Sequence, residues 1–204
     1  MSELAIQPVL ISESYRKEQE RMHETIPGYG AVGQYYAPMV AEIIKKLGVS
    51  HLLDYGCGHN LSLFKALGGK LKQLGLPYKV TLQAYDPGVP QLAAPAVPAQ
   101  MVTCLDVLEH IEPELIDNVL DDLVRVTKAV LFCTIASGPA VKTLSDGRNA
   151  HLIQQPLKWW LPKFWDRFEL QNVMVDGIVQ RHGGGGSDGY LIIAYAKPQE
   201  IVAP

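Results

Sequence analysis

Residues 51–60 have the sequence HLLDYGCGHN, and this stretch decides the fold of the chain. A short apolar run is followed by Gly56 and Gly58, which are one residue apart. Glycine has no side chain, so the backbone can turn sharply there and approach a ligand closely. In open parallel α/β sheets, ligands bind at the carboxyl ends of the strands. The pattern therefore indicates a ligand-binding turn at the end of a short buried strand.

Strands and helices alternate on both sides of this turn. Short apolar runs predict strands at 51–55, 79–85, 101–105, 129–135, 171–179 and 190–196. Helical spacing of apolar residues, or a run of charged ones, predicts helices at 13–25, 37–47, 61–74, 113–128 and 155–168. Pro162 is expected to kink or split the last helix. The glycine run at 183–186 is expected to join the last two strands in an antiparallel hairpin. This order predicts an α/β fold with a mostly parallel sheet.

The bulk properties limit the classes of function. The 204 residues suffice for one domain, which we divide into an N-terminal helix and candidate lid (1–38) and a core (39–204). A net charge of −3 gives no general attraction to nucleic acid, and no apolar run approaches the length of a membrane span. Three cysteines without a CxxC pair favour a reducing, cytoplasmic setting, and six scattered histidines suggest no metal site.

The glycine turn departs from the common dinucleotide pattern. A G-x-G-x-x-G motif needs a third glycine where Leu61 stands, and no Walker lysine–serine pair follows. Asp54 precedes the turn and would repel a diphosphate, whereas it suits a cationic or amino-bearing ligand. A purely structural turn stays open as an alternative.

Asp86 supplies the second clue. It ends a predicted strand within AYDP (84–87), where a carboxylate can accept hydrogen bonds from both hydroxyls of a ribose. A nucleoside that joins a ribose to a positively charged tail is S-adenosylmethionine.

Three motifs then carry a resemblance to a known family. LLDYGCG (52–58), AYDP and TCLDVLEHIEP (103–113), in this order, resemble motifs of class I S-adenosylmethionine-dependent methyltransferases. The similarity is close over residues 50–135, and LDVLEHI is similar to the small-molecule, methyltransferase-11/12-like branch. The resemblance implies a Rossmann-like sheet, S-adenosylmethionine as cofactor and S-adenosylhomocysteine as product.

The resemblance also implies roles for individual residues. Asp86 would hold the ribose, Asp54 and the following backbone would face the methionine part, and Asp106 would flank the cofactor. A role for Asp106 as a strand-end or helix-capping residue, instead of a cofactor contact, stays open as an alternative. The full set of implied cofactor-binding residues is Asp54, Tyr55, Gly56, Cys57, Gly58, Asp86, Pro87, Cys104, Leu105 and Asp106.

One departure from the family concerns the segment after Asp86. Asp106 follows Asp86 by only 20 residues, and GVPQLAAPAVPAQ (88–100) is too rich in proline for a full helix and strand. We therefore expect the third strand of the family and its helix to be missing or vestigial, and the adenine contacts stay unassigned.

The acceptor side rests on weaker patterns. His110 and His151 are candidate bases. The polar stretch 145–160 follows a predicted strand, and its Asp146, Arg148 and Asn149 are candidate substrate contacts. A hydrogen-bonded turn is the alternative for that stretch. Tyr35 in the candidate lid is a further substrate contact, and Tyr29, Gln34 and Tyr36 are candidates for either ligand.

These patterns predict methyl transfer to an oxygen or nitrogen atom of a small or medium-sized acceptor. The alternative is a non-catalytic module or partner subunit that binds S-adenosylmethionine or S-adenosylhomocysteine, because fold does not determine function. A small-molecule acceptor is the expected partner. Nucleic acid and membrane partners are not expected, and the oligomeric state stays open.

Overall fold

A six-stranded sheet forms the centre of the protein, in a computed structural model that describes residues 8–76, 79–175 and 189–198. The strand order is β2-β1-β3-β4-β6-β5. β1, β2, β3 and β4 run parallel, and β6 is antiparallel to both neighbours. The strands are β1 (His51–Tyr55), β2 (Thr81–Tyr85), β3 (Ala99–Leu105), β4 (Thr127–Ala136), β5 (Phe168–Val175) and β6 (Gly189–Ala196). The predicted parallel sheet with a closing antiparallel pair is confirmed, while the glycine run 183–186 lies outside the described residues.

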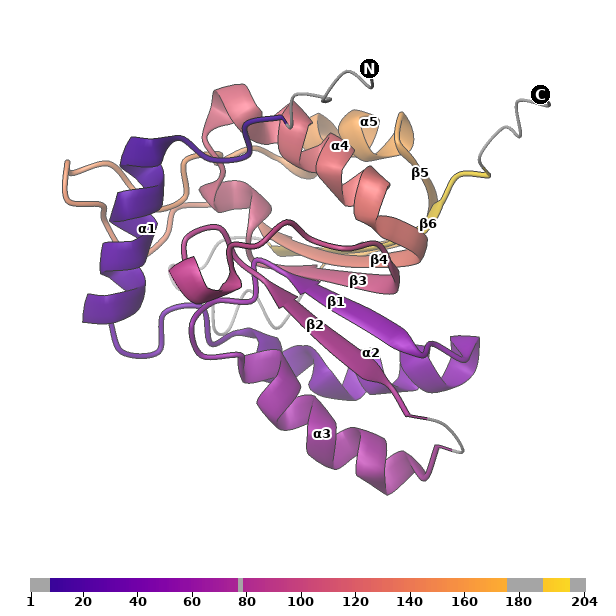
Figure 1. Ribbon diagram of the computed structural model, residues 1–204. Helices are drawn as coiled ribbons and strands as arrows, with labels where there is room; N and C mark the ends of the chain where they lie inside the picture. Colours follow the sequence, from indigo (N-terminus) through magenta and orange to yellow (C-terminus); the bar gives the residue numbers. More distant parts are fainter. Residues whose placement is uncertain (1–7, 77–78, 176–188, 199–204) are drawn as a thin grey trace, which may run out of the picture.

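Helices cover both faces of the sheet (Figure 1). α2 (Gly33–Leu47) and α3 (Ser62–Leu74) lie on one face, and α4 (Ile116–Val126) and α5 (Leu157–Trp165) lie on the other. Successive strand residues alternate between the two apolar layers, as the pleat requires. Leu52 packs with α2 and α3, whereas its neighbour Leu53 packs with α4 and α5. In the described ranges, no helix is long and apolar enough to cross a membrane.

The segment between β2 and β3 lacks the strand and helix of a full Rossmann-like unit. It contains only the short 3₁₀ helix η1 (Pro90–Leu92) and leaves β2 at the edge of the sheet. The segment folds back on the end of β2, where the Asp86 N–H donates to the Leu92 carbonyl (3.0 Å). The predicted absence of the third strand is confirmed.

Two prolines lie inside helices, and Pro162, which was expected to kink or split its helix, does not split it. Pro162 lies inside α5, which is continuous, and Pro38 lies inside α2, which begins four residues before the predicted start. An interior proline costs about 3 kcal/mol. Trp160 and Phe164 flank Pro162 and are fully buried. Because each buried aromatic contributes roughly 1.5–3 kcal/mol, packing offsets the broken hydrogen bond.

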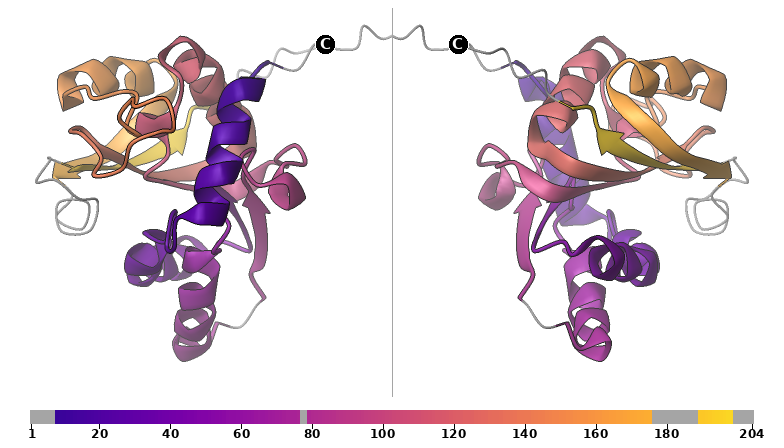
Figure 2. Two further views of the ribbon diagram at one scale, coloured as in Figure 1. Left: turned by 90° about the vertical axis from the view of Figure 1, so that its left-hand side faces the viewer. Right: turned by 90° about the vertical axis from the view of Figure 1, so that its right-hand side faces the viewer.

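α1 (Glu13–Thr25) belongs to neither helix layer. It lies at the edge of the sheet where β1, β2 and β3 end (Figures 1 and 2). The Ser12 hydroxyl caps it by accepting the Tyr15 N–H (3.2 Å). One face of α1 is buried, with Tyr15 and Met22 packed against Leu144 and Ala150. The helix predicted here is therefore only partly exposed.

Candidate functional site

A cavity of about 500 Å³ opens where β1, β2 and β3 end. Its size falls within the range of roughly 300–1,000 Å³ that is common for small-molecule sites. The wall combines the glycine turn, the residues after β2 and β3, the loop after β4, and α1 with the segment that follows it. The predicted site residues that line the cavity are Tyr35, Tyr55, Gly56, Gly58, Asp86, Pro87, Leu105, Asp106, His110 and His151.

The glycine turn is held by its own N–H groups. The N–H groups of Gly56 and Cys57 both donate to the Tyr85 carbonyl (2.8 and 3.1 Å), and that of Gly58 donates to Asp86 Oδ2 (2.8 Å). These three donors are therefore already used within the protein. A phosphate cradle needs free N–H groups. The turn accordingly lacks the free N–H groups of Gly56, Cys57 and Gly58 that a diphosphate would need.

Asp86 is oriented by two backbone N–H groups. Its Oδ2 accepts the Gly58 N–H, and its Oδ1 accepts the Gly88 N–H (2.9 Å). A carboxylate offers about four acceptor positions, so each oxygen keeps capacity for one more donor. Asp86 is 8% exposed and lines the cavity, so that capacity is available to a ligand there. A vicinal diol, such as that of a ribose, matches this pair of acceptors.

His23 of α1 lies beside Asp86. Its Nε2 is 3.9 Å from Asp86 Oδ2, which is too long for a direct hydrogen bond. Burial lowers the pKa of His23, an effect that the Asp86 charge opposes. Burial likewise raises the pKa of Asp86, and here the His23 side chain acts in the opposite direction.

Three residues of the implied cofactor set do not line the cavity: Asp54, Cys57 and Cys104. Asp54 is buried behind the turn, where its Oδ1 accepts the Thr103 hydroxyl (2.8 Å). Burial raises the pKa of Asp54 to about 7 and also raises the pKa of the Cys57 thiol. Cys104 is fully buried in the core beneath α4. The structure therefore places these three side chains outside the cavity wall.

The raised pKa of Asp54 predicts a pH-dependent stability. Because its folded pKa of about 7 exceeds the usual value near 3.9, the native state holds a proton that the unfolded chain releases between these values. The stabilising contribution is complete below about pH 4 and is lost as the pH rises through 7. We expect Asp54→Asn to flatten the fall in unfolding free energy between about pH 4 and 7, measured by urea denaturation.

Other buried acids titrate in the wild type and in Asp54→Asn alike. The difference between the stability-versus-pH profiles of these two proteins therefore isolates Asp54. Asp117→Asn is the matched control, because Asp117 is exposed. Parallel profiles for the wild type and Asp54→Asn would contradict the assignment.

His110 and His151 form a pair at the cavity wall. Their ring centroids are 4.8 Å apart, with the rings nearly perpendicular. His110 Nδ1 lies 2.8 Å from the Ala150 carbonyl oxygen, and His151 Nδ1 lies 2.6 Å from that of Gly138. Since a carbonyl only accepts, each Nδ1 carries the hydrogen. Each Nε2 is then the acceptor of a neutral imidazole.

The pKa values of His110 and His151 agree with neutral imidazole rings. Burial, followed by the neighbouring His151, lowers the pKa of His110 to about 3. Burial also lowers the pKa of His151. Both imidazoles are therefore neutral at neutral pH, with an Nε2 that can accept a hydrogen bond.

Three polar residues of the loop after β4, Asp146, Arg148 and Asn149, do not line the cavity. Asp146 and Arg148 pair with each other (2.7 Å), with about half of each side chain exposed. Asn149 instead organises the loop: its Oδ1 accepts the N–H groups of Ala140 and His151, both at 2.9 Å. The structure therefore does not bring the predicted substrate contacts Asp146, Arg148 and Asn149 into the cavity wall. Asn149 positions His151.

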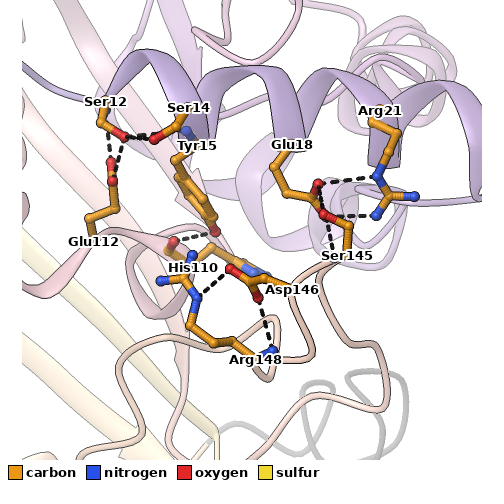
Figure 3. A network of polar contacts seen from close by, with 10 residues as sticks. All are labelled: Ser12, Ser14, Tyr15, Glu18, Arg21, His110, Glu112, Ser145, Asp146 and Arg148. Carbon is orange, nitrogen blue, oxygen red and sulfur yellow. Dashed lines mark hydrogen bonds and ion pairs between the residues drawn. The ribbon is translucent and has the colours of Figure 1, made fainter.

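Hydrogen bonds fasten α1 to the segments that follow β3 and β4 (Figure 3). The Ser12 hydroxyl donates to Glu112 (2.6 Å), and the Tyr15 hydroxyl donates to the His110 carbonyl (2.7 Å). Further along the helix, Glu18 accepts the Ser145 hydroxyl (2.7 Å). These contacts hold α1 across one side of the cavity.

The segment after α1 lines the cavity with Tyr29, Gln34 and Tyr35. Tyr29 contacts the edge of the His23 ring, with centroids 4.9 Å apart, and its hydroxyl donates to Gln19 Oε1 (2.9 Å). Tyr36 instead is fully buried against Phe132, which corrects its candidacy as a ligand contact.

Asp106 and Glu109 fix the segment after β3. Asp106 has a φ of +53°, an uncommon conformation for a residue other than glycine, and its Oδ1 accepts the Thr134 hydroxyl (3.1 Å). Glu109 is fully buried, and its Oε1 accepts the Ala136 N–H (2.8 Å). Both acids therefore bind this segment to β4, while Asp106 also faces the cavity.

Four polar side chains in the cavity wall were not predicted from the sequence: Tyr15, Gln19, His23 and Lys142. The first three are spaced by four residues along α1, which places them on one helix face. That spacing was the available signal. No sequence pattern indicated Lys142, which lies in the loop after β4. Among the described residues, no group of three histidine, cysteine, aspartate or glutamate side chains is arranged to hold a metal ion.

No protein-family model matches the sequence, and no curated protein is significantly similar to it. Among solved structures, the 1,6-didemethyltoxoflavin-N1-methyltransferase of Burkholderia thailandensis, with 1,6-didemethyltoxoflavin and S-adenosylhomocysteine bound, matches with a TM-score of 0.59 and 10% identity. The match covers 95% of this chain and 94% of that chain. The magnesium protoporphyrin IX methyltransferase of Synechocystis, with S-adenosylhomocysteine bound, matches at 15% identity over 88% of this chain and 93% of that chain, with a TM-score of 0.49.

The first of these matches agrees with the sheet topology described above. This chain combines four parallel strands, the strand order β2-β1-β3-β4-β6-β5 and an antiparallel β6 in one sheet. The chain has the Rossmann-like fold of the class I S-adenosylmethionine-dependent methyltransferases.

Proposed function

We propose that the protein is an S-adenosylmethionine-dependent methyltransferase that acts on an oxygen or nitrogen atom of a small or medium-sized acceptor. The observation that carries this proposal is the pairing of Asp86 with the glycine turn. Asp86 offers two open acceptor positions beside a turn whose N–H groups are already used. This combination suits a ribose joined to a cationic tail and does not suit a diphosphate.

The residues present fit such a cofactor. Asp86 would hold the ribose hydroxyls, Pro87 would lie beside the adenine, and Gly56 and Gly58 would let the methionine part approach the backbone. Leu105 and Asp106 line the same cavity and would contact the cofactor from the end of β3. The structural neighbour from Burkholderia thailandensis has S-adenosylhomocysteine bound within this fold, which supports the proposal.

The cofactor supplies a methyl group that is already activated on a sulfonium. The protein then has to hold the acceptor in line, exclude water and take up a proton. With a hydroxyl acceptor, an O–CH₃ bond forms while the S–CH₃ bond breaks, the electron pair stays on sulfur, and the hydroxyl proton moves to a histidine Nε2. His110 or His151 serves as that base. α1 and the segment after it act as the lid.

Replacing either histidine tests this role. We expect His110→Ala or His151→Ala to lower turnover by about tenfold, because the remaining imidazole is near enough to substitute in part. The double variant should lose roughly 100-fold or more. The affinity for S-adenosylhomocysteine should stay unchanged in all three variants. Turnover is measured by transfer of an isotope-labelled methyl group.

His51→Ala is the control for these variants, since His51 begins β1 at the opposite edge of the sheet from the cavity. If the double variant turned over at the wild-type rate, neither histidine would be the base.

Calorimetric titration with S-adenosylmethionine and with S-adenosylhomocysteine tests the proposal itself. Saturable binding of both, followed by methyl transfer to a member of an acceptor panel, is the expected result. Binding without transfer to any acceptor would instead favour the non-catalytic binding module. Absence of binding would overturn both forms of the proposal.

We also propose that the protein works in the reducing cytoplasm. Cys57, Cys104 and Cys133 are all free thiols and all buried, as a reducing compartment permits.

A further inference from the structure

The charges of the cavity wall are unevenly distributed. Among the described residues that line it, the only carboxylates are Asp86 and Asp106, and the only lysine or arginine is Lys142. The carboxylates follow β2 and β3, beside the glycine turn. Lys142 belongs to the loop after β4 and lies near the two histidines. The cavity therefore has an acidic part and a cationic part.

Lys142 lies against an aromatic ring instead of a carboxylate. Its Nζ is 5.5 Å from the centroid of the Tyr29 ring. In the part of the chain that the structure describes, it forms no ion pair, whereas Arg148 in the same loop is paired with Asp146. A cation–π contact leaves an ammonium with N–H donors available to an anion.

The backbone places Lys142 next to the candidate bases. The Ala150 N–H donates to the Lys142 carbonyl (3.0 Å), so Lys142 lies across from the residue before His151. Asn149 binds Ala140 through both its amide oxygen and its amide nitrogen, which holds the start of the same loop. One ammonium and two neutral imidazoles therefore share this part of the wall.

Tyr29 lies between the two parts of the cavity. Its ring contacts His23, which lies beside Asp86. The same ring also lies near His110, at a centroid distance of 6.2 Å, and near Lys142. A cofactor held at Asp86 would leave the region of Lys142, His110 and His151 for the acceptor.

We propose that this region is an acceptor subsite that selects a small organic acid, whose carboxylate is bound by Lys142 while its methyl-accepting hydroxyl or amine faces His110 and His151. This inference rests on the proposed function, since it names the acceptor of the same site. The uncompensated ammonium attracts an anion and repels a cationic amine. The neutral imidazoles accept the hydrogen of the acceptor group, so the two interactions orient the acid.

The test compares hydroxy acids of increasing size with their neutral amides. Each acid and its amide are titrated into the protein saturated with S-adenosylhomocysteine, and binding is followed by saturation-transfer NMR. We expect at least one acid to bind roughly fivefold more tightly than its amide, as for a partly exposed ion pair. High salt should reduce this preference.

Charge variants at Lys142 then identify the source of the preference. Lys142→Gln should remove it, Lys142→Arg should retain it, and Lys142→Glu should reverse it. Lys142 is exposed, so these variants are expected to fold, and thermal denaturation checks this. Lys128→Gln is the matched control, because Lys128 is exposed and lies outside the cavity wall.

The outcomes separate this inference from the proposed function. Equal binding of every acid and its amide, or a preference that survives Lys142→Glu, would overturn the acid-selective subsite while S-adenosylhomocysteine still binds. Failure of S-adenosylhomocysteine to bind would overturn the proposed function. The acid–amide comparison on the protein alone would then still report on Lys142.

Discussion

Gly56→Ala is expected to lower the free energy of unfolding by about 2–5 kcal/mol. Gly56 has a φ of +74°, in the left-handed region that costs a residue with a Cβ about 1–2 kcal/mol. An added Cβ would also lie 2.4 Å from Val107 Cγ2 and 2.8 Å from Val107 Cγ1. Overpacking of this kind costs roughly 1–3 kcal/mol. Urea denaturation at constant pH measures the change.

Two further variants separate the causes. Gly68→Ala is the matched control: Gly68 lies in α3, nothing lies within 4 Å of an added Cβ, and its φ is not positive. It should be neutral or more stable by about 0.5–1 kcal/mol. Adding Val107→Ala to Gly56→Ala should remove the steric part and leave the backbone part, as a double-mutant cycle will show. A Gly56→Ala protein as stable as the wild type would contradict the close packing of the turn.

Asp86→Ala is expected to weaken binding of S-adenosylhomocysteine by about 100-fold or more. Two charge-assisted hydrogen bonds to a ribose, each contributing about 1.5–3 kcal/mol, would be lost. Asp86→Asn keeps one acceptor oxygen and should lose affinity by roughly tenfold. Calorimetric titration of the three proteins measures the difference.

Asp86 also has a structural role, because it accepts the N–H groups of Gly58 and Gly88. Thermal denaturation therefore accompanies each titration, and Asp117→Ala, at an exposed position paired with Lys163, is the control. A ligand comparison removes the remaining ambiguity: the wild type should prefer adenosine to 2′,3′-dideoxyadenosine, and Asp86→Ala should not. Undiminished affinity in a folded Asp86→Ala protein would overturn the ribose assignment.

The sheet was predictable because its signals are local. Buried parallel strands are continuous apolar runs, and prolines at 88–100 leave no room for a further helix and strand. The ends of β1, β2 and β3 meet at one edge in any such sheet. Asp86 and Gly56 therefore met in space as expected. The split expected at Pro162 does not occur, because burial of the neighbouring side chains outweighs the local cost of the proline.

The orientation of single side chains was less predictable. Asp54 and Asp86 both follow apolar strands, yet Asp54 is buried against Thr103 of β3 whereas Asp86 faces the cavity. Asp54 is the penultimate residue of β1, while Asp86 follows the last residue of β2. Asp54 is in register with Ala84 of β2, so Asp86 lies two positions further along and beyond the last strand residue. The position of each carboxylate relative to the strand end therefore decides between the interior and the cavity.

The sequence by itself determined the mostly parallel sheet, the absent third strand, and the glycine turn with Asp86, since these depend on local patterns along the chain. The order of the strands came only from the structure. Only the tertiary structure decided which side chains complete the cavity. α1 reaches the site through contacts such as Ser12 with Glu112 and Glu18 with Ser145, which join residues about a hundred positions or more apart. Such contacts depend on how separate elements pack. The spacing along α1 places His23 on one helix face with Tyr15 and Gln19, but only the packing shows that this face lines the cavity, and no local pattern indicates Lys142.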